Sequence, residues 1–289
     1  MLEQIAISGL AVGAIYALIA IGFTIVFSTV RIVNFAHGEL VMAGGMLYAY
    51  LHSVHGLSVA PAVFLAIAGC AVLGWFIYEA GLAGIDPANH ISQVMITLGV
   101  GITLKGLVQV FIGKDTMFPP AFSESTGVQV AGTSIAAQTL WVAGALVVFV
   151  LLLHILRQHT RLGTSMRAVS INRYAAILMG ISPRRAAAAS FVVAGLIGGA
   201  AGALFAPLAS VSYDNGIFLG IKGFAAAILG GIGNPVGAVL GGLLLGLTES
   251  LAAGYLSSVY KDAVSLLVLL VVLLVRPQGL IGKILPQKL

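Results

Sequence analysis

Charged side chains are scarce in this sequence. Only 8% of the 289 residues are Asp, Glu, Lys or Arg, whereas 60% are hydrophobic. A water-soluble domain carries about 25% charged residues, because its outer surface has to be hydrated. The scarcity therefore excludes an ordinary soluble globule, and it predicts a protein whose outer surface faces lipid.

Cysteine and the residue patterns of catalysis are also nearly absent. The single cysteine, Cys70, lies in an apolar run, which excludes an internal disulfide and any multi-cysteine metal or redox motif. The sequence has no Walker A loop, no His-Glu-x-x-His and no Gly-x-Ser-x-Gly. His37-Gly38-Glu39 has the His-x-Glu order of zinc deaminases, but that chemistry also needs Pro-Cys-x-x-Cys. We therefore predict a chain that is not an enzyme, with no metal site and no cofactor of its own.

The excess of basic residues does not indicate a nucleic-acid partner. The formal net charge is +5, but the cations lie between apolar runs and form no basic patch interleaved with aromatic residues. Cations in such positions are typical of loops retained on the cytoplasmic side of a membrane. We expect the lipid bilayer, and no nucleic acid, as a partner.

Apolar runs of about 20 residues, the length that spans the hydrocarbon core as a helix, follow one another along the chain. They predict an all-α polytopic bundle with about nine crossings, or eight or ten if a short run is broken or re-entrant. The short second run and the region of Lys222 are the two such places. The runs are Ile5–Phe27, Phe35–Leu51, Val59–Tyr78, Ile91–Ile112, Thr139–Leu156, Ala186–Leu208, two passes within Asn215–Thr248 and Ala263–Val275.

Glycine is abundant, with 37 residues, and many glycines are spaced by four. Pairs such as Gly9/Gly13 and Gly242/Gly246 let helix backbones approach closely in a membrane. The spacing predicts dense packing within one subunit, or a dimer face for some of the pairs.

The distribution of arginine predicts the orientation of the chain. Six of its 14 Lys and Arg residues lie in the loop 157–185, which contains no acidic residue, and the C-terminal tail adds Arg276, Lys283 and Lys288. The positive-inside rule places both regions in the cytoplasm. The N-terminus then lies outside, together with the extracytoplasmic loop 113–138.

The arginine-rich loop favours a helix between Gly163 and Pro183, with an imperfect apolar face. Its apolar residues are Met166, Val169, Tyr174, Ile177, Leu178 and Ile181. Two interpretations remain open. Either the arginines only fix the topology and the helix lies on the lipid headgroups, or the helix docks into a groove of a cytoplasmic ATPase and transmits its movement.

Several polar side chains fall within or near the predicted crossings. A charge at bilayer depth costs about 2.5–3.5 kcal/mol on insertion scales, so these residues face a cavity or a partner. The candidates are Asn34, His37, Glu39, Lys105, Gln109, Lys222, Glu249 and Asp262. Structural pairing and lining of a transport path both remain open for the carboxylates.

Four segments, in chain order, identify a family. They are GLAVGAIYALIAIGFTIVF with VNFAHGEL (Val33–Leu40), GTSMRAVSINRYAAILMGIS, KGFAAAILGGIGNPVGAVLGGLLLGLTESL (Lys222–Leu251) and YKDAVSLLVLLVVLLVRPQGLIG (Tyr260–Gly282). Over nearly the whole chain they resemble the permease subunits of branched-chain amino acid ABC importers of the LivH type.

The resemblance implies a single transmembrane permease domain over residues 1–289 in a bacterial inner membrane. It also implies a second permease of the LivM type, two cytoplasmic ATPase subunits that bind ATP and Mg, and a periplasmic substrate-binding protein. The implied coupling segment contains Gly163, Arg167, Ala168, Ala176, Met179 and Gly180. The implied region near the translocation path contains Asn34, His37, Gly38 and Glu39.

The substrate and two other function classes stay open. Branched-chain or other hydrophobic amino acids fit a path lined by apolar and small residues, whereas relatives of the family also carry urea, short amides or other amino acids. The other classes are an ion-coupled secondary transporter or channel, which would use Glu39, Glu249 or Lys105, and a non-transporting scaffold. Only the importer needs residues 166–180 as a docking surface.

Overall fold

The computed structural model describes residues 2–86, 89–123, 127–130 and 133–282. These residues are almost entirely helical, with one short antiparallel hairpin of β1 (Val128–Val130) and β2 (Thr133–Ile135). The helices are α1 (Leu2–Val30), α2 (His37–Ser53), α3 (Val59–Phe76) with the π-helical η1 (Ile77–Leu82), α4 (His90–Phe111), α5 (Ala137–His159), α6 (Arg161–Ile171), α7 (Arg173–Leu178), α8 (Pro183–Ala209), α9 (Asn215–Gly230), α10 (Pro235–Tyr255) and α11 (Lys261–Val275).

Six of the described helices are long and apolar enough to cross a membrane: α1, α3 with η1, α4, α5, α8 and α10. The prediction of a helical, multi-pass membrane protein is confirmed. Three further apolar helices, α2, α9 and α11, have 17, 16 and 15 residues. At 1.5 Å per residue they are about 23–26 Å long, less than the roughly 30 Å of a hydrocarbon core. The count of nine crossings stays a prediction.

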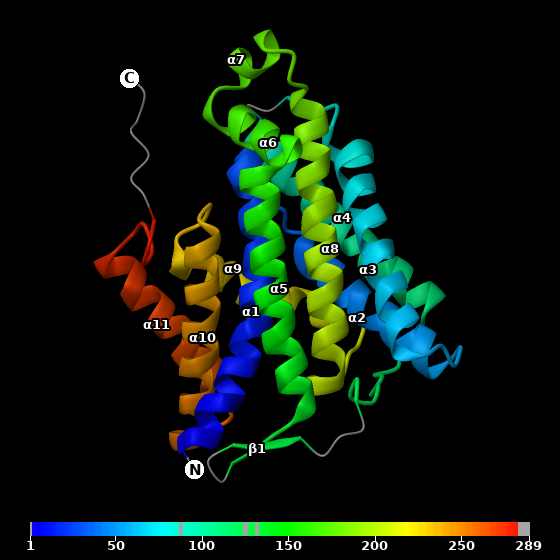
Figure 1. The fold of residues 1–289 in the computed structure, drawn as a ribbon, viewed down its shortest axis with the longest axis vertical. Helices are drawn as coiled ribbons and strands as arrows, with labels where there is room; N and C mark the ends of the chain where they lie inside the picture. The colour runs from blue at the N-terminus through cyan, green and yellow to red at the C-terminus, as the bar shows by residue number, and fades with distance from the viewer. Residues whose placement is uncertain (1, 87–88, 124–126, 131–132, 283–289) are drawn as a thin grey trace.

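Helix α1 forms the centre of the bundle, and most of its residues are buried. It packs against α8, α9, α10 and α5, and Figure 1 shows it between α5 and α10. The outer helices α3, α4 and α5 expose large apolar side chains such as Phe64, Val110 and Leu151. Such a surface is suited to lipid, because water would not solvate it.

Glycines bring α1 and α10 into backbone contact. A Cβ atom at Gly246 would overlap the backbone of Gly13, and one at Gly242 would overlap the backbone of Ala17. The pairing of early α1 residues with late α10 residues shows that the two helices run antiparallel. The glycines spaced by four in these two helices therefore pack inside the subunit rather than at a dimer face.

The arginine-rich loop lies at one end of the bundle and the hairpin at the other (Figure 1). The sequence predicts one helix over 163–183, and this is wrong: the loop contains two helices, α6 and α7. The break is at Asn172, whose backbone is extended and whose side-chain oxygen accepts a hydrogen bond of 3.0 Å from the Ala175 N–H. An asparagine N-cap stabilises a new helix start, which competes with continuing the first helix.

Parts of two predicted loops lie outside the described residues. These are residues 124–126 and 131–132 of the loop 113–138, and Lys283 and Lys288 of the tail. The preceding part of the tail is fixed by backbone hydrogen bonds from Leu280 to Leu229 (2.9 Å) and from Ile281 to Gly230 (3.1 Å).

Candidate functional site

Helix α2 begins inside the bundle rather than at its end. The chain leaves α1 at Val30, turns through residues 31–36 and starts α2 at His37, without a side-chain cap at that N-terminus. The imidazole of His37 lies against Gly22, where a Cβ atom would overlap it. Because Gly22 is eight residues, about 12 Å, before the end of α1, the imidazole of His37 lies well inside the bundle.

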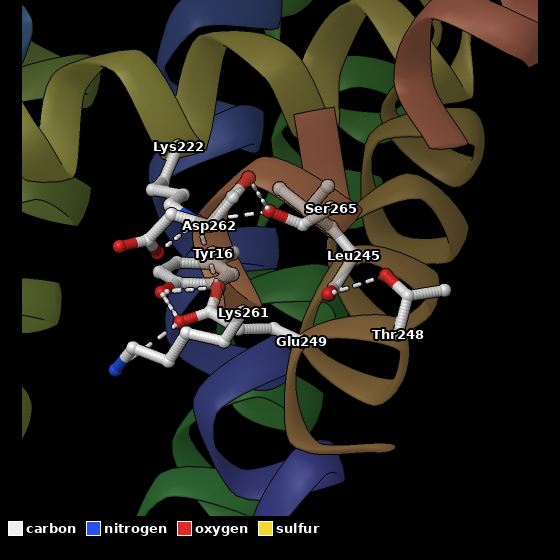
Figure 2. Close-up of polar contacts among 8 residues, drawn as sticks. All are labelled: Tyr16, Lys222, Leu245, Thr248, Glu249, Lys261, Asp262 and Ser265. Carbon is white, nitrogen blue, oxygen red and sulfur yellow. Dashed lines mark hydrogen bonds and ion pairs between the residues drawn. The ribbon is translucent and has the colours of Figure 1, made fainter. Parts of the chain in front are cut away.

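Helix α9 lies across the bundle. Its first turn touches α2, since a Cβ atom at Gly216 would overlap the carboxylate of Glu39. Its middle packs on α1 at Ile19, and its last residue, Gly230, packs on Gly237 of α10. Figure 2 shows α9 running across α1. The region of Lys222 is therefore an oblique helix in mid-bundle, one of the two places where the sequence predicts an irregular crossing.

The first turns of α2 and α9 thus meet within the protein, and we call this contact the α2–α9 junction. It contains Asn34, His37, Gly38, Glu39 and Gly216. A Cβ atom at Gly38 would overlap the Gly216 carbonyl, so only glycine permits this approach. Non-helical backbone at membrane depth is tolerated where it is buried in protein or lines a cavity.

Polar atoms at the junction are buried and poorly satisfied. Asn34, His37 and Glu39 are at most 6% exposed. Asn34 Nδ2 and Glu39 Oε2 have no hydrogen-bond partner among the described residues, and the His37 ring, near the Ile19 carbonyl, makes no hydrogen bond of normal geometry. Since an unsatisfied buried group costs about 1–3 kcal/mol, the junction has unused capacity to bind a polar group.

Lys105 of α4 supplies a positive charge near the junction. Its ammonium group lies 5.3 Å from the centre of the Tyr213 ring, and its charge acts on the Glu39 carboxylate. Asp214, directly before α9, adds a negative charge on the same side. The hydroxyl of Ser212 donates a hydrogen bond to the Asp214 carboxylate. This hydrogen bond, together with the positive charge of Lys105, lowers the pKa of the Asp214 carboxyl. The junction therefore has charges of both signs next to its unsatisfied polar atoms.

The remaining predicted path residues, Lys222 and Glu249, belong to a separate ion cluster (Figure 2). Lys222 Nζ lies 3.0 Å from Glu249 Oε2 and 2.7 Å from Asp262 Oδ1, and it donates to Ser265 Oγ at 3.0 Å. Tyr16 donates to Glu249 Oε2 at 3.1 Å. The cluster links α1, α9, α10 and α11. The buried charges of Lys222 and Glu249 are therefore paired with one another and with Asp262. Their lining of a path stays a prediction.

Sequence reasoning missed Tyr16, Ser265 and Gly216 at these two places. Tyr16 lies in the middle of an apolar run, and Ser265 follows Asp262 by three residues. The only sequence signal for Ser265 is that spacing, which places both side chains on one face of α11. For Gly216 there is no signal, since its role depends on the approach of α2.

The predicted coupling residues divide into a buried and an exposed set. Gly163, Met166 and Ala176 face the bundle, where Met166 and Ala176 pack with Val169 and Ala186 in a small core. The exposed set comprises Tyr174 (81% exposed), Ile177 (50%), Leu178 (88%) and Met179 (80%). We call these four residues the α7 patch.

The other coupling residues have distinct places. Gly180 has a left-handed backbone, φ 76°, that ends the α7 turn. Ala168 is half-buried, and Arg167 is exposed and lines a cavity beside α5. One part of the predicted apolar face therefore packs against the bundle, and the other part, the α7 patch, is exposed.

The family model described as branched-chain amino acid transport system / permease component matches residues 5–273. The chain belongs to this family. The resemblance seen in the sequence is thereby confirmed, and so is the prediction of a transport subunit rather than an enzyme. The match extends over all six described helices that are long enough to span a membrane, apart from the first three residues of α1.

Full-length relatives support the assignment. The chain is 33% identical to the high-affinity branched-chain amino acid permease protein LivH of Escherichia coli K12, covering 96% of this chain and 94% of LivH. It is 34% identical to BraD of Pseudomonas aeruginosa, covering 98% and 96%. The probable branched-chain amino acid permease LivH of Methanocaldococcus jannaschii is 27% identical, covering 92% and 88%.

Proposed function

We propose that this chain is one of two permease subunits of an ATP-driven importer for branched-chain or other hydrophobic amino acids in a bacterial inner membrane. Support for the substrate comes from LivH and BraD, which the chain matches over nearly their full length. A second permease of the LivM type forms the other half of the path. A periplasmic binding protein delivers the amino acid, and two ATPase subunits bind ATP and Mg.

The end of the bundle with α6 and α7 is the cytoplasmic end. It contains the arginines of the loop 157–185, the residues that the positive-inside rule retains in the cytoplasm. The N-terminus and the hairpin then face the periplasm, because they lie at the opposite end (Figure 1). The periplasmic side is where the binding protein meets the permease.

The α7 patch is the observation that supports a docking role. Its four large side chains, on α7 and directly after it, are at least half exposed. Burial of an apolar side chain in a partner's groove stabilises the contact by about 1.5–3 kcal/mol. Met166, Val169 and Ala176 of the small core tie α6 and α7 to the bundle, so movement of the ATPase is transmitted to the permease.

The α2–α9 junction is the part of the path that this subunit contributes. Its free polar atoms and the charges of Glu39 and Lys105 suit the ammonium and carboxylate groups of an amino acid. The N-terminal ends of α2 and α9 favour negative charge at the same place. The apolar side chain of the substrate would lie along the small and apolar residues around it.

Docking is tested with Ile177→Asp and Leu178→Asp in the α7 patch. Each variant should lose co-purification of the ATPase and ATP-dependent uptake, while the purified chain keeps its thermal stability. Phe118→Asp is the matched control, since Phe118 is 77% exposed in the loop at the opposite end. Undiminished ATPase binding by both α7 variants would contradict the docking role.

A second measurement separates the importer from a self-contained transporter. The chain alone in liposomes should not accumulate leucine, with or without a proton or sodium gradient. Uptake should appear only with the second permease, the ATPases, ATP and the binding protein. Accumulation by the isolated chain would overturn the proposed function.

A further inference from the structure

A cavity of about 250 Å³ opens between α1, α5, α6 and the start of α10. It is much larger than the roughly 10–15 Å³ that holds a single water. Its walls are apolar at one side, with Ile21, Val150 and Leu153, and basic at the other, with Arg157 and Arg167. The two arginines also line a second, small cavity of about 10 Å³ on the side of Ser28 and Thr29.

Arg157 and Arg167 have no acidic partner among the residues that the structure describes. No carboxylate in the described part of the chain forms an ion pair with Arg157 or Arg167; the described ion pairs involve Arg184, Lys222 and Lys261. Like charges that share one cavity destabilise each other unless an anion binds between them. The loop sequence contains no Asp or Glu that could supply one.

The position of the cavity indicates where its occupant comes from. Arg157 lies in the last turn of α5, the end of a helix that is long enough to span a membrane. Below it, Val147, Leu151 and Leu152 of α5 are more than half exposed, and Val236 beside the cavity is 62% exposed. A ligand with an anionic head at the arginines and an apolar tail along α5 fits both walls.

We propose that this cavity binds the phosphate headgroup of an anionic phospholipid from the cytoplasmic leaflet. Arg157 and Arg167 donate hydrogen bonds to the phosphate oxygens, which suit the planar fork of a guanidinium group. An acyl chain lies over Val150 and Leu153. Basic pockets between membrane helices on the cytoplasmic side have the same combination of charge and depth.

Bound lipid would couple the membrane to the loop. Arg157 belongs to α5 and Arg167 to α6, so a phosphate between them links the end of a spanning helix to the helix that precedes the α7 patch. The site is distinct from the α7 patch, because Tyr174, Ile177, Leu178 and Met179 do not line the cavity. The proposal therefore does not depend on ATPase docking or on the identity of the substrate.

The test is native mass spectrometry of the delipidated full chain and of the assembled importer, titrated with phosphatidylglycerol, phosphatidylethanolamine or inorganic phosphate. Phosphatidylglycerol should bind more tightly than the zwitterionic lipid. Each guanidinium group that lines the cavity should strengthen binding of the phosphate about fivefold, so Arg157→Gln with Arg167→Gln should weaken binding about 25-fold.

Arg161→Gln with Arg173→Gln is the matched control. It removes the same charge from the same loop at two exposed positions outside the cavity, and it should change phosphatidylglycerol binding by less than about threefold. Equal losses in both double variants, or no loss in either, would overturn the site. Competition by inorganic phosphate at equal concentration would show a free-anion site instead. Binding to the chain but not to the importer would show that another subunit covers the cavity, and would also overturn the proposal.

Discussion

Lys222 and Glu249 form an ion pair of 3.0 Å, and their side chains are only 2% and 7% exposed. Two further charges complete the cluster: Asp262 lies 2.7 Å from Lys222, and Lys261 lies 3.7 Å from Glu249. The formal charges of the four residues cancel. Lys222 and Glu249 are the two buried charges of the cluster, and each of them is stable there only while it keeps its partner.

Loss of the central cation should therefore destabilise the bundle strongly. Lys222→Met leaves Glu249 buried without its nearest positive charge, and we expect a loss of about 3–5 kcal/mol in the free energy of unfolding. Lys261→Met is the control, because the Lys261 side chain is 40% exposed and its pair is longer, so a loss below about 1 kcal/mol is expected. Thermal unfolding in detergent measures both. Equal effects would show that burial of Lys222 does not matter.

The Tyr16 hydroxyl also stabilises this cluster. It donates to Glu249 Oε2 at 3.1 Å, and it ties α1 to α10. A hydrogen bond to a charged group contributes about 1.5–3 kcal/mol, and we expect Tyr16→Phe to lose about that amount. Tyr255→Phe removes the same hydroxyl from a ring that is 62% exposed, and it should be neutral. The result would be contradicted if both variants unfolded at the temperature of the wild-type chain.

The close packing of α1 on α10 leads to a third prediction, that a larger residue at the contact destabilises the bundle. Gly246→Ala places a methyl group on the backbone of Gly13, which cannot move without separating the helices. The variant should lose folded yield and about 1–3 kcal/mol of stability, the usual cost of overpacking a core. Gly144→Ala in α5 is the matched control, since a Cβ atom there meets nothing within 4 Å. Equal folded yields of the two variants would exclude this contact.

Hydropathy and glycine spacing predict the frame of this fold well. A run of apolar residues determines a spanning helix locally, so α1, α3, α4, α5, α8 and α10 follow from the sequence. The spacing of Gly242 and Gly246 likewise marks a close helix contact before the partner helix is known. Both signals depend on neighbouring residues in the chain.

The polar sites are less predictable because they depend on distant contacts. Lys222 and Glu249 look alike as buried charges in the sequence, and only the packing of α9 across α1 and against α10 brings them together. Glu39 has the same sequence character, yet α9 presents Gly216 to it rather than a lysine. The sequence pattern does not predict the break at Asn172 for a local reason: the apolar periodicity of the loop continues through it, and a single capping asparagine is a weaker signal than that periodicity.

Glu39 provides the sharpest test of the α2–α9 junction. Its carboxylate is buried, and its Oε2 atom has no hydrogen-bond partner in the described structure. Glu39→Gln keeps the shape and removes the charge. Because a buried charge without a full set of partners is costly, the variant should be at least as stable as the wild-type chain. If the carboxylate receives the ammonium group of the substrate, uptake by the reconstituted importer should fall at least about tenfold, the equivalent of about 1.4 kcal/mol.

The pattern of effects matters more than the loss of uptake alone. Glu39→Gln should still assemble with the ATPases and keep ATP hydrolysis, because the α7 patch lies at the end of the bundle and not at the junction. Asp115→Asn is the control, an equal charge change at an exposed position of the loop 113–138, and it should transport normally. Full uptake by Glu39→Gln would show that the Glu39 carboxylate does not contact the substrate. Loss of assembly would instead make Glu39 a structural residue, since a group that only contacts substrate has no part in holding the subunits together.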